Sequence, residues 1–393
     1  MPTQSTDVNG TPFGIDYAGS GLTWTIKKGV EVTGTLAAVH SIHSDNTLIN
    51  KGSLFGTTVG VYFEGTGGAS SSVVKNLASG EIGGQYGIAL TNFQGNAVIE
   101  NAGEIDAAQF GIYVYAFLGS AKVTNEGDIG GQIAVQFYGS SAATVENHGH
   151  IDGAQYGVVF YGSAVGSSGA KVDNFGHIDG GLYAIVIEGI SGQSSKVVNH
   201  AGAVIDGSMV AIYSSEALNL KNEGKIKGAV VSSEYADKLV NKGKLSGDVA
   251  LGEGDDVFKN KGDKAKSGMI DSGEGNDLLV LAAKAEKLVF DSALNAATNV
   301  DTIKHFASGK DAIYLDEDIF SMITPGTLSS SAFHKGTSAA DADDRIIYDK
   351  KSGALYYDPD GVGGVGQTQF AKLDGGPKLK AGDFTVGEYS FAI

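Results

Sequence analysis

The chain of 393 residues contains no cysteine, so neither a disulfide framework nor a thiolate metal site is available to it. It has only 5 prolines, and 45 acidic residues outnumber 28 basic ones, which gives a formal net charge of −17. Nucleic acid and anionic membrane surfaces are bound by clustered lysine and arginine, which this sequence lacks, so we exclude both as partners. The partners that the acidic charge favours are cations.

Long hydrophobic runs are also missing. The longest apolar run, around residues 278–283, is far too short to span a bilayer, so no transmembrane segment is expected. The opening residues, MPTQSTDVNGTPFG, lack the basic region and apolar core of a secretory signal. None of the 8 histidines begins a His-Glu-x-x-His pair, which excludes a metalloprotease with that zinc site.

What the chain does have is a repeat between residues 50 and 260. An apolar residue, any residue and asparagine are followed by a glycine and usually an isoleucine, as in VIENAGEID, KVTNEGDIG and KVDNFGHID. The repeated asparagines lie 19 to 27 residues apart, which is typical of one coil of a solenoid. They are Asn50, Asn76, Asn101, Asn125, Asn147, Asn174, Asn199, Asn222, Asn241 and Asn260.

The residues between these asparagines are typical of strands. They alternate between apolar and polar, or form β-branched and aromatic runs such as residues 111–115 and 156–160. Asparagine tolerates the left-handed backbone of a turn, and its side-chain amide can hydrogen-bond to the amide stacked on it in the next coil. We therefore expect an internal asparagine ladder. The sequence therefore predicts an all-β fold, a parallel β-helix of about ten coils that must stack to bury their apolar faces.

Two glycine-rich turns follow the last clear repeats. Residues 251–258 read LGEGDDVF and residues 272–279 read SGEGNDLL, and Ser-Gly at 246–247 and at 267–268 flanks them in the same register. Glycine allows a turn tight enough to aim carbonyl oxygens inward, and the aspartate supplies a hard anionic oxygen. We therefore expect the turns to stack and to hold calcium (Ca²⁺) between them. The predicted ligands are Gly252, Gly254, Asp256, Gly273, Gly275 and Asp277.

These motifs resemble the calcium-binding nonapeptides of the repeats-in-toxin (RTX) proteins of Gram-negative bacteria, with Leu251 and Ser272 in place of the first glycine. Residues 300–315, 341–358 and 369–373 are similar to the C-terminal region of the serralysin family. The resemblance covers about residues 245–393. It implies an RTX β-roll, type I secretion through an uncleaved C-terminal signal, and an extracellular or cell-surface location. The ending, residues 387–393, is compatible with such a signal.

The expected organisation has four segments. They are an N-terminal cap (1–45), parallel β-helix repeats (46–243), RTX-like calcium-binding coils (244–282), and a β-rich C-terminal module with the secretion signal (283–393). Within the last segment we expect a short helix over residues 284–294 and a hairpin turn at residues 358–361.

Two classes of function stay open. The repeats alone suffice for a secreted calcium-binding protein with a structural, surface or adhesive role, for which extracellular polysaccharide or cell-surface matrix is a candidate partner. The alternative is a polysaccharide-active enzyme, an epimerase or lyase, on a β-helix scaffold. We favour the first and predict no catalytic residue, because no basic cluster lies beside acid and base candidates. His150 and His177 share a repeat position with Glu104, Asp128 and Lys225, which indicates a solvated edge.

Overall fold

The computed structural model describes residues 1–65, 71–115, 119–139, 142–162, 169–189, 193–262 and 265–389. The fold is an all-β parallel β-solenoid of about 12 turns, with 56% strand and 2% helix. This confirms the predicted fold class, and the number of turns is close to the number predicted. The chain divides into two compact units, Met1–Glu216 and Ala217–Ile393. This division does not test the predicted segment boundaries at residues 45, 243 and 282, which stay predictions.

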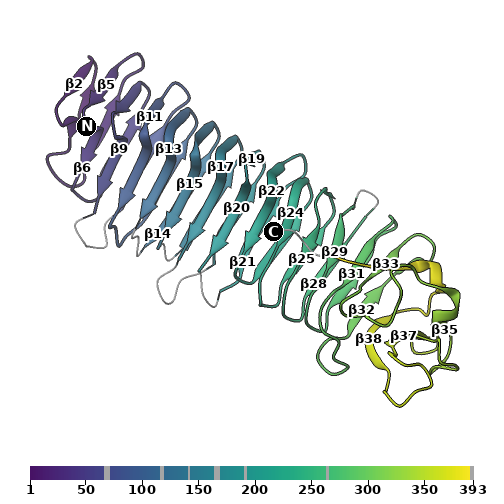
Figure 1. Ribbon diagram of the computed structural model, residues 1–393. Coiled ribbons are helices and arrows are strands. Elements are labelled where there is room, and N and C mark those ends of the chain that lie inside the picture. Colours follow the sequence, from purple (N-terminus) through teal and green to yellow (C-terminus); the bar gives the residue numbers. More distant parts are fainter. Residues whose placement is uncertain are drawn as a thin grey trace. The chain divides into compact units, whose positions relative to one another are not determined.

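In the first unit, each coil adds one short strand to a parallel sheet, here sheet A (Figure 1). Its strands are β1 (Thr3–Gln4), β4 (Thr23–Ile26), β7 (Thr47–Asn50), β10 (Ser72–Asn76), β12 (Ala97–Asn101), β14 (Ser120–Asn125), β16 (Ala142–Asn147), β18 (Lys171–Asn174) and β21 (Ser195–Asn199).

After the asparagine turn, each coil continues into a second parallel sheet, sheet B. A bulge divides its longest strands; between β11 and β13, for example, the register shifts between Gly84 and Tyr86. The strands are β2 (Val8–Gly10), β3 (Phe13–Asp16), β5 (Glu31–Gly34), β6 (Ala37–Ser41), β8 (Ser53–Gly56), β9 (Val59–Glu64), β11 (Glu81–Thr91), β13 (Glu104–Tyr115), β15 (Asp128–Tyr138), β17 (His150–Tyr161), β19 (His177–Gly180), β20 (Tyr183–Glu188) and β22 (Val204–Ser214).

Columns of identical side chains hold the coils together. In sheet B, Ile105, Ile129 and Ile151 stack in register and are each at most 1% exposed, because alternate residues of a strand point inward. The predicted asparagine ladder is also confirmed. The side-chain amide of Asn101 donates to Asn125 Oδ1 at 2.8 Å, and the same bond joins successive ladder asparagines within each unit.

The second unit has the same two kinds of strand. Sheet A contains β23 (Leu218–Asn222), β25 (Lys238–Asn241), β28 (Val257–Asn260), β30 (Leu278–Val280), β32 (Asp301–Lys304) and β38 (Thr368–Leu373). Sheet B contains β24 (Lys225–Val231), β26 (Lys244–Leu245), β27 (Val249–Ala250), β29 (Met269–Asp271), β31 (Lys287–Phe290), β33 (Ala312–Asp316), β34 (Gly326–Thr327) and β39 (Phe384–Gly387).

The second unit ends in a β-rich module, as predicted (β35, β37 and β38 in Figure 1). Strands β36 (Ile346–Asp349), β37 (Ala354–Tyr357) and β38 are antiparallel, and β35 (Phe333–His334) joins β36. The described residues of this module include two short 3₁₀ helices, η1 (Ser330–Ala332) and η2 (Ala381–Asp383). The predicted turn at residues 358–361 lies in the connection from β37 to β38, where the Gly361 N–H donates to Asp358 Oδ1 at 2.9 Å.

The prediction of a helix over residues 284–294 is wrong. This segment contains strand β31, which pairs in parallel with β29 on one side and β33 on the other. Pairing with two neighbours satisfies the backbone groups of the strand and buries Leu288, Val289 and Phe290. An isolated helix of about this length is only marginally stable in water, so the pairing and burial available within the solenoid override the local helical pattern.

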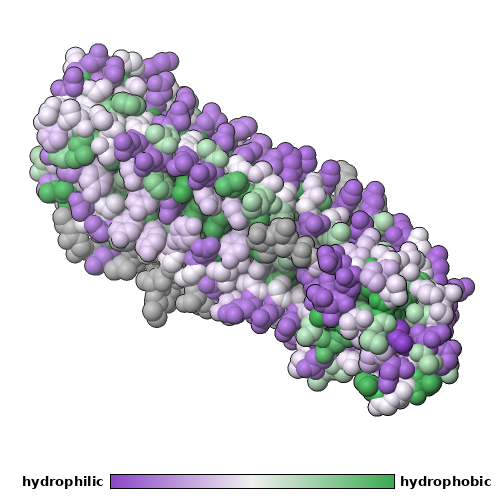
Figure 2. Space-filling model, viewed as in Figure 1, coloured by the Kyte–Doolittle hydropathy of each residue, from purple (hydrophilic) through white to green (hydrophobic). Residues whose placement is uncertain are grey.

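Hydrophilic residues are spread over the visible face of each unit, with hydrophobic residues in small patches between them (Figure 2). Within the described part of the chain, no helix has the length and apolar character needed to cross a membrane.

Candidate functional sites

The two glycine turns of the second unit stack as predicted. One connects β27 to β28 and the other connects β29 to β30, and Glu253 pairs with Glu274 in a parallel bridge. The Glu274 N–H donates to the Gly252 carbonyl at 2.9 Å, and the Gly254 N–H donates to the Glu274 carbonyl at 2.8 Å. The turns therefore hydrogen-bond directly to each other through their backbones.

All four predicted glycine ligands have left-handed backbone. Their φ angles are 96° at Gly252, 116° at Gly254, 82° at Gly273 and 147° at Gly275. A Cβ atom on Gly273 would lie 1.8 Å from the Gly252 carbonyl oxygen, and one on Gly275 would lie 1.9 Å from the Gly254 carbonyl oxygen. Only glycine permits this combination of left-handed turn and close stacking.

The two predicted aspartate ligands belong to a longer column, the aspartate ladder, formed by Asp237, Asp256, Asp277 and Asp301. Asp256 Oδ1 accepts the Asp237 N–H at 2.7 Å, and Asp277 Oδ1 accepts the Asp256 N–H at 2.8 Å. Asp301 Oδ1 accepts the Asp277 N–H at 3.2 Å. Each carboxylate thus caps the backbone of the preceding coil, and all four residues are at most 3% exposed.

The second carboxylate oxygens make this column unusual. Asp301 Oδ2 accepts the Ser272 hydroxyl at 2.9 Å. Asp256 Oδ2 and Asp277 Oδ2 are buried, and neither meets the geometry of a hydrogen bond in the described structure. The Asp277 carboxyl does lie close to the side chains of Asp301 and Ser272, which both act to lower its pKa. A buried polar oxygen without a partner is costly, which marks both atoms as ligand candidates.

Burial also shifts the acidity of the ladder. Loss of hydration raises the pKa of Asp256 to about 8 and that of Asp277 to about 6. The pKa of Asp301 is raised well above its ordinary value by burial and then by the charge of Asp277. On the other side of the second turn, burial and the charge of Asp291 raise the pKa of Asp271 to about 7. These carboxylates need protons or a cation to neutralise them.

The donor types at these turns, carboxylate oxygens and backbone carbonyls without sulfur or nitrogen, are those that calcium prefers. Among the described residues, however, no three carboxylates of the ladder offer oxygens that all lie within 4.8 Å of one another. The role of Gly252, Gly254, Asp256, Gly273, Gly275 and Asp277 as calcium ligands stays a prediction. Asp237 and Asp301 were not predicted from the sequence. Each lies two residues before a buried apolar residue, just as Asp256 lies two residues before Phe258.

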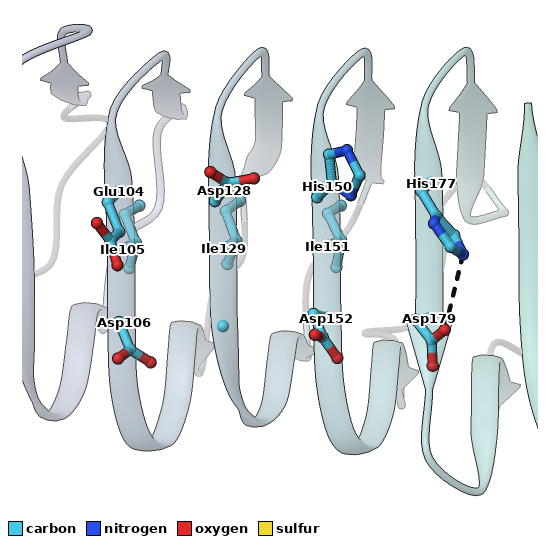
Figure 3. A pocket seen from close by; sticks show the side chains of 11 residues that line it. Glu104, Ile105, Asp106, Asp128, Ile129, His150, Ile151, Asp152, His177 and Asp179 are labelled. Carbon is cyan, nitrogen blue, oxygen red and sulfur yellow. Dashed lines mark ion pairs between the residues drawn. The ribbon is translucent and has the colours of Figure 1, made fainter.

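A different site lies on sheet B of the first unit, in a groove of about 440 Å³ over β13, β15, β17 and β19 (Figure 3). Two rows of polar side chains line it, separated by the inward-pointing isoleucines. The first row is Glu104, Asp128, His150 and His177; the second is Asp106, Asp152 and Asp179, with Gly130 between the first two.

The first row was expected to be a solvated edge, and Glu104, Asp128 and His150 are indeed exposed. The second row was missed. Its signal in the sequence is an aspartate five residues after the ladder asparagine, as in Asn147 and Asp152. His177 Nε2 lies 3.6 Å from Asp179 Oδ2.

Another groove, of about 410 Å³, lies on sheet B of the second unit. Lys244, Lys266 and Lys287 line it together with Asp248, whose Oδ1 accepts the Met269 N–H at 2.7 Å. The sheet B grooves of the two units therefore differ in charge, acidic with histidines in the first and mainly basic in the second.

No protein-family model matches this chain, and no curated protein matches it either. The resemblance of residues 245–393 to RTX and serralysin proteins therefore has no support from a family match and rests on the quoted motifs alone.

Proposed function

We propose that this protein is a secreted calcium-binding β-solenoid with a structural, surface or adhesive role. The observation that carries the proposal is the pair of buried, unpartnered oxygens, Asp256 Oδ2 and Asp277 Oδ2, beside glycine turns that stack in register. A divalent cation would neutralise carboxylates that otherwise lose hydration and repel one another. The repeats themselves supply a repeating β-solenoid scaffold in each unit, which suits a structural or adhesive role and requires no catalytic group.

Protons compete with calcium for this column. Because the pKa of Asp256 is raised to about 8, its carboxyl is largely protonated at neutral pH when no cation is bound. Calcium binding must therefore release protons and must strengthen as pH rises. This proton release distinguishes calcium bound by the buried aspartate ladder from calcium bound weakly by exposed carboxylates.

The test is calorimetric titration of the full chain with calcium. The double variant Asp256→Asn with Asp277→Asn keeps an oxygen for each backbone N–H but removes both buried charges. The matched control, Glu253→Gln with Glu274→Gln, removes two exposed charges from the same turns. We expect binding to be lost in the first variant and retained in the second. Absence of calcium binding in the unmodified protein, or equal binding in both variants, contradicts the proposal.

Export belongs to the same proposal and rests on the RTX and serralysin resemblance. We propose type I secretion to the cell exterior or surface of a Gram-negative bacterium, directed by the C-terminal part of the chain. Residues 390–393 of the quoted ending lie outside the described residues. A passenger fused to residues 330–393 should be exported by a cell with a matching transporter. A passenger that stays inside overturns the export assignment and leaves calcium binding untouched.

The second candidate, an extracellular epimerase or lyase, is favoured by one observation. The groove of the first unit places His150 and His177 beside Asp152 and Asp179, which are groups able to move protons (Figure 3). A screen on alginate, pectin and related polymers with calcium present separates the two candidates. Turnover that disappears in Asp152→Asn would establish the enzyme, whereas a structural protein gives none.

A further inference from the structure

One trio of side chains in the described part of the chain has the spacing of metal ligands. His177, Asp179 and Asp206 offer one atom each, and these three atoms all lie within 4.8 Å of one another. His177 and Asp179 belong to β19, and Asp206 belongs to the next strand of sheet B, β22. None of the three is a predicted calcium ligand, and all lie in the first unit.

The fold brings the trio together by register. Parallel pairing sets Asp179 directly opposite Asp206, so both carboxylates are on the outer face of neighbouring coils. His177 precedes Asp179 by two residues and therefore points to the same face, which Figure 3 shows for these two side chains. Val204 occupies the position opposite His177, so the trio contains one imidazole and two carboxylates.

The distances favour a shared ion over a hydrogen bond. His177 Nε2 and Asp179 Oδ2 are 3.6 Å apart, which is too long for a hydrogen bond. Two ligands on a tetrahedral ion with bonds of about 2.1 Å are about 3.4 Å apart, close to the observed separation. His177 Nε2 is also shielded from solvent without a hydrogen-bond partner among the described residues.

The donor chemistry points to a transition metal. Neutral imidazole nitrogen is a poor ligand for calcium but a good one for zinc and its neighbours, and two carboxylates balance a divalent charge. All three side chains are only partly buried, and His177 and Asp179 line the groove, so a bound ion keeps positions open to solvent or a further ligand. His150, whose ring centroid is 5.8 Å from that of His177, lies beside the trio.

We propose that His177, Asp179 and Asp206 bind a divalent transition metal ion on sheet B of the first unit. The ion bridges two neighbouring coils and does not depend on the calcium proposal, whose ligands are in the second unit.

The test uses full-length protein stripped with a chelator and then titrated with zinc in buffer that contains millimolar calcium. We expect one zinc site that calcium does not displace. His177→Ala and Asp206→Asn should each weaken it at least tenfold. Replacing zinc with cobalt should give visible absorption bands that both variants lose, which reports on the ligands directly.

Three matched controls should retain the zinc site. His150→Ala removes the histidine one coil earlier, and Asp152→Asn removes the carboxylate one coil earlier. His200→Ala removes an imidazole whose Nε2 also lacks a hydrogen-bond partner and lies 3.7 Å from Asp173 Oδ1. Absence of zinc binding, unchanged binding in His177→Ala, or an equal loss in His150→Ala or His200→Ala overturns the proposal. The Asp256→Asn, Asp277→Asn variant should bind zinc normally, which separates this result from the calcium test.

Discussion

The two units use the same position of the coil in different ways. This position, called the ladder slot, is the one that the aspartate ladder occupies in the second unit. It lies two residues before a fully buried residue of a sheet A strand. In the first unit it holds small or neutral residues, namely Asn46, Ser72, Ala97, Ala121, Ala143, Ala170 and Ser195. In the second unit it holds Leu218 and then the aspartate ladder of Asp237, Asp256, Asp277 and Asp301.

Two of the neutral side chains at this position cap the preceding coil without a charge, and four others are alanines that make no side-chain hydrogen bond. Asn46 Oδ1 accepts the Leu22 N–H at 2.8 Å, and Ser195 Oγ accepts the Ala170 N–H at 3.0 Å. The aspartates of the second unit make the same bond to the preceding coil. Because the solenoid does not need a carboxylate here, the buried charges point to a ligand rather than to folding. Experiments that measure the first and second units separately can test this difference.

The largest expected effect is a pH dependence confined to the second unit. The pKa of Asp256 is raised to about 8 and that of Asp277 to about 6, from an ordinary value of 3.8. The folded state therefore holds these protons more tightly than the unfolded chain. Without calcium, the stabilisation is complete below about pH 4 and is lost as pH rises through about 6 and then 8. At about 1.4 kcal/mol per pKa unit, the loss is of the order of several kcal/mol.

Hydrogen exchange measured from pH 5 to 8, and corrected for the intrinsic exchange rate, checks this prediction. Peptides of the second unit should lose protection as pH rises, while peptides of the first unit should not. Millimolar calcium should suppress the loss. Equal losses in both units would show that the aspartate ladder is not their cause.

The next largest effect should be common to both units, because both contain the asparagine ladder. The Asn125 amide donates to Asn147 Oδ1 at 2.9 Å, and its oxygen accepts from Asn101 at 2.8 Å. Asn125→Ala leaves these buried partners unsatisfied and should destabilise the first unit by about 3 kcal/mol. Asn241→Ala should do the same in the second unit. Denaturant unfolding is the measurement, and Asn219→Ala, an exposed asparagine on β23, should change stability little.

A smaller effect is expected from Gly273→Ala. The residue has a φ of 82°, and a Cβ atom there would lie 1.8 Å from the carbonyl oxygen of Gly252. The strain should destabilise the second unit by about 1–3 kcal/mol and weaken calcium binding, because the stacked turns must separate. Gly382→Ala is the control, since no atom lies within 4 Å of a Cβ atom at that position. Equal melting temperatures for the two variants would show that the turns are not closely stacked.

The smallest effect should come from surface ion pairs, which both units contain. Lys122 Nζ lies 2.9 Å from Glu146 Oε2 in the first unit, and Lys242 Nζ lies 3.1 Å from Glu223 Oε1 in the second. Both lysines are substantially exposed, so Lys122→Gln and Lys242→Gln should each change stability by less than about 1 kcal/mol. A larger change in thermal unfolding for only one of them would reveal a difference between the units beyond the aspartate ladder.

Much of the solenoid could be read from the sequence because its interactions repeat. One asparagine per coil, followed by glycine and an apolar residue, is a local pattern, and stacking makes each copy bond to the next. The pattern failed where tertiary pairing outweighs local preference. Residues 284–294 have a helical pattern, yet β31 (Lys287–Phe290) forms there because β29 and β33 lie on both sides of it.

The candidate sites were predictable only in part. The glycine turns carry a distinctive motif, so Asp256 and Asp277 could be selected from the sequence. Asp237 and Asp301 lack the Gly-x-Gly turn before them, and only the register of sheet A reveals that they continue the same column. Asp206 was missed for a similar reason, since it lies seven residues after Asn199, whereas Asp179 lies five after Asn174.

The sequence by itself determined the coil, its asparagine ladder and the place of the glycine turns, because these depend on residues close together in the chain. Tertiary structure alone decided which side chains of different coils share a site. Asp179 and Asp206 meet through the pairing of β19 with β22, and the two unpartnered oxygens of the aspartate ladder arise from burial by neighbouring coils. The physical reason is that coil lengths vary, so contacts between coils follow the register of the sheets and not a constant spacing in sequence.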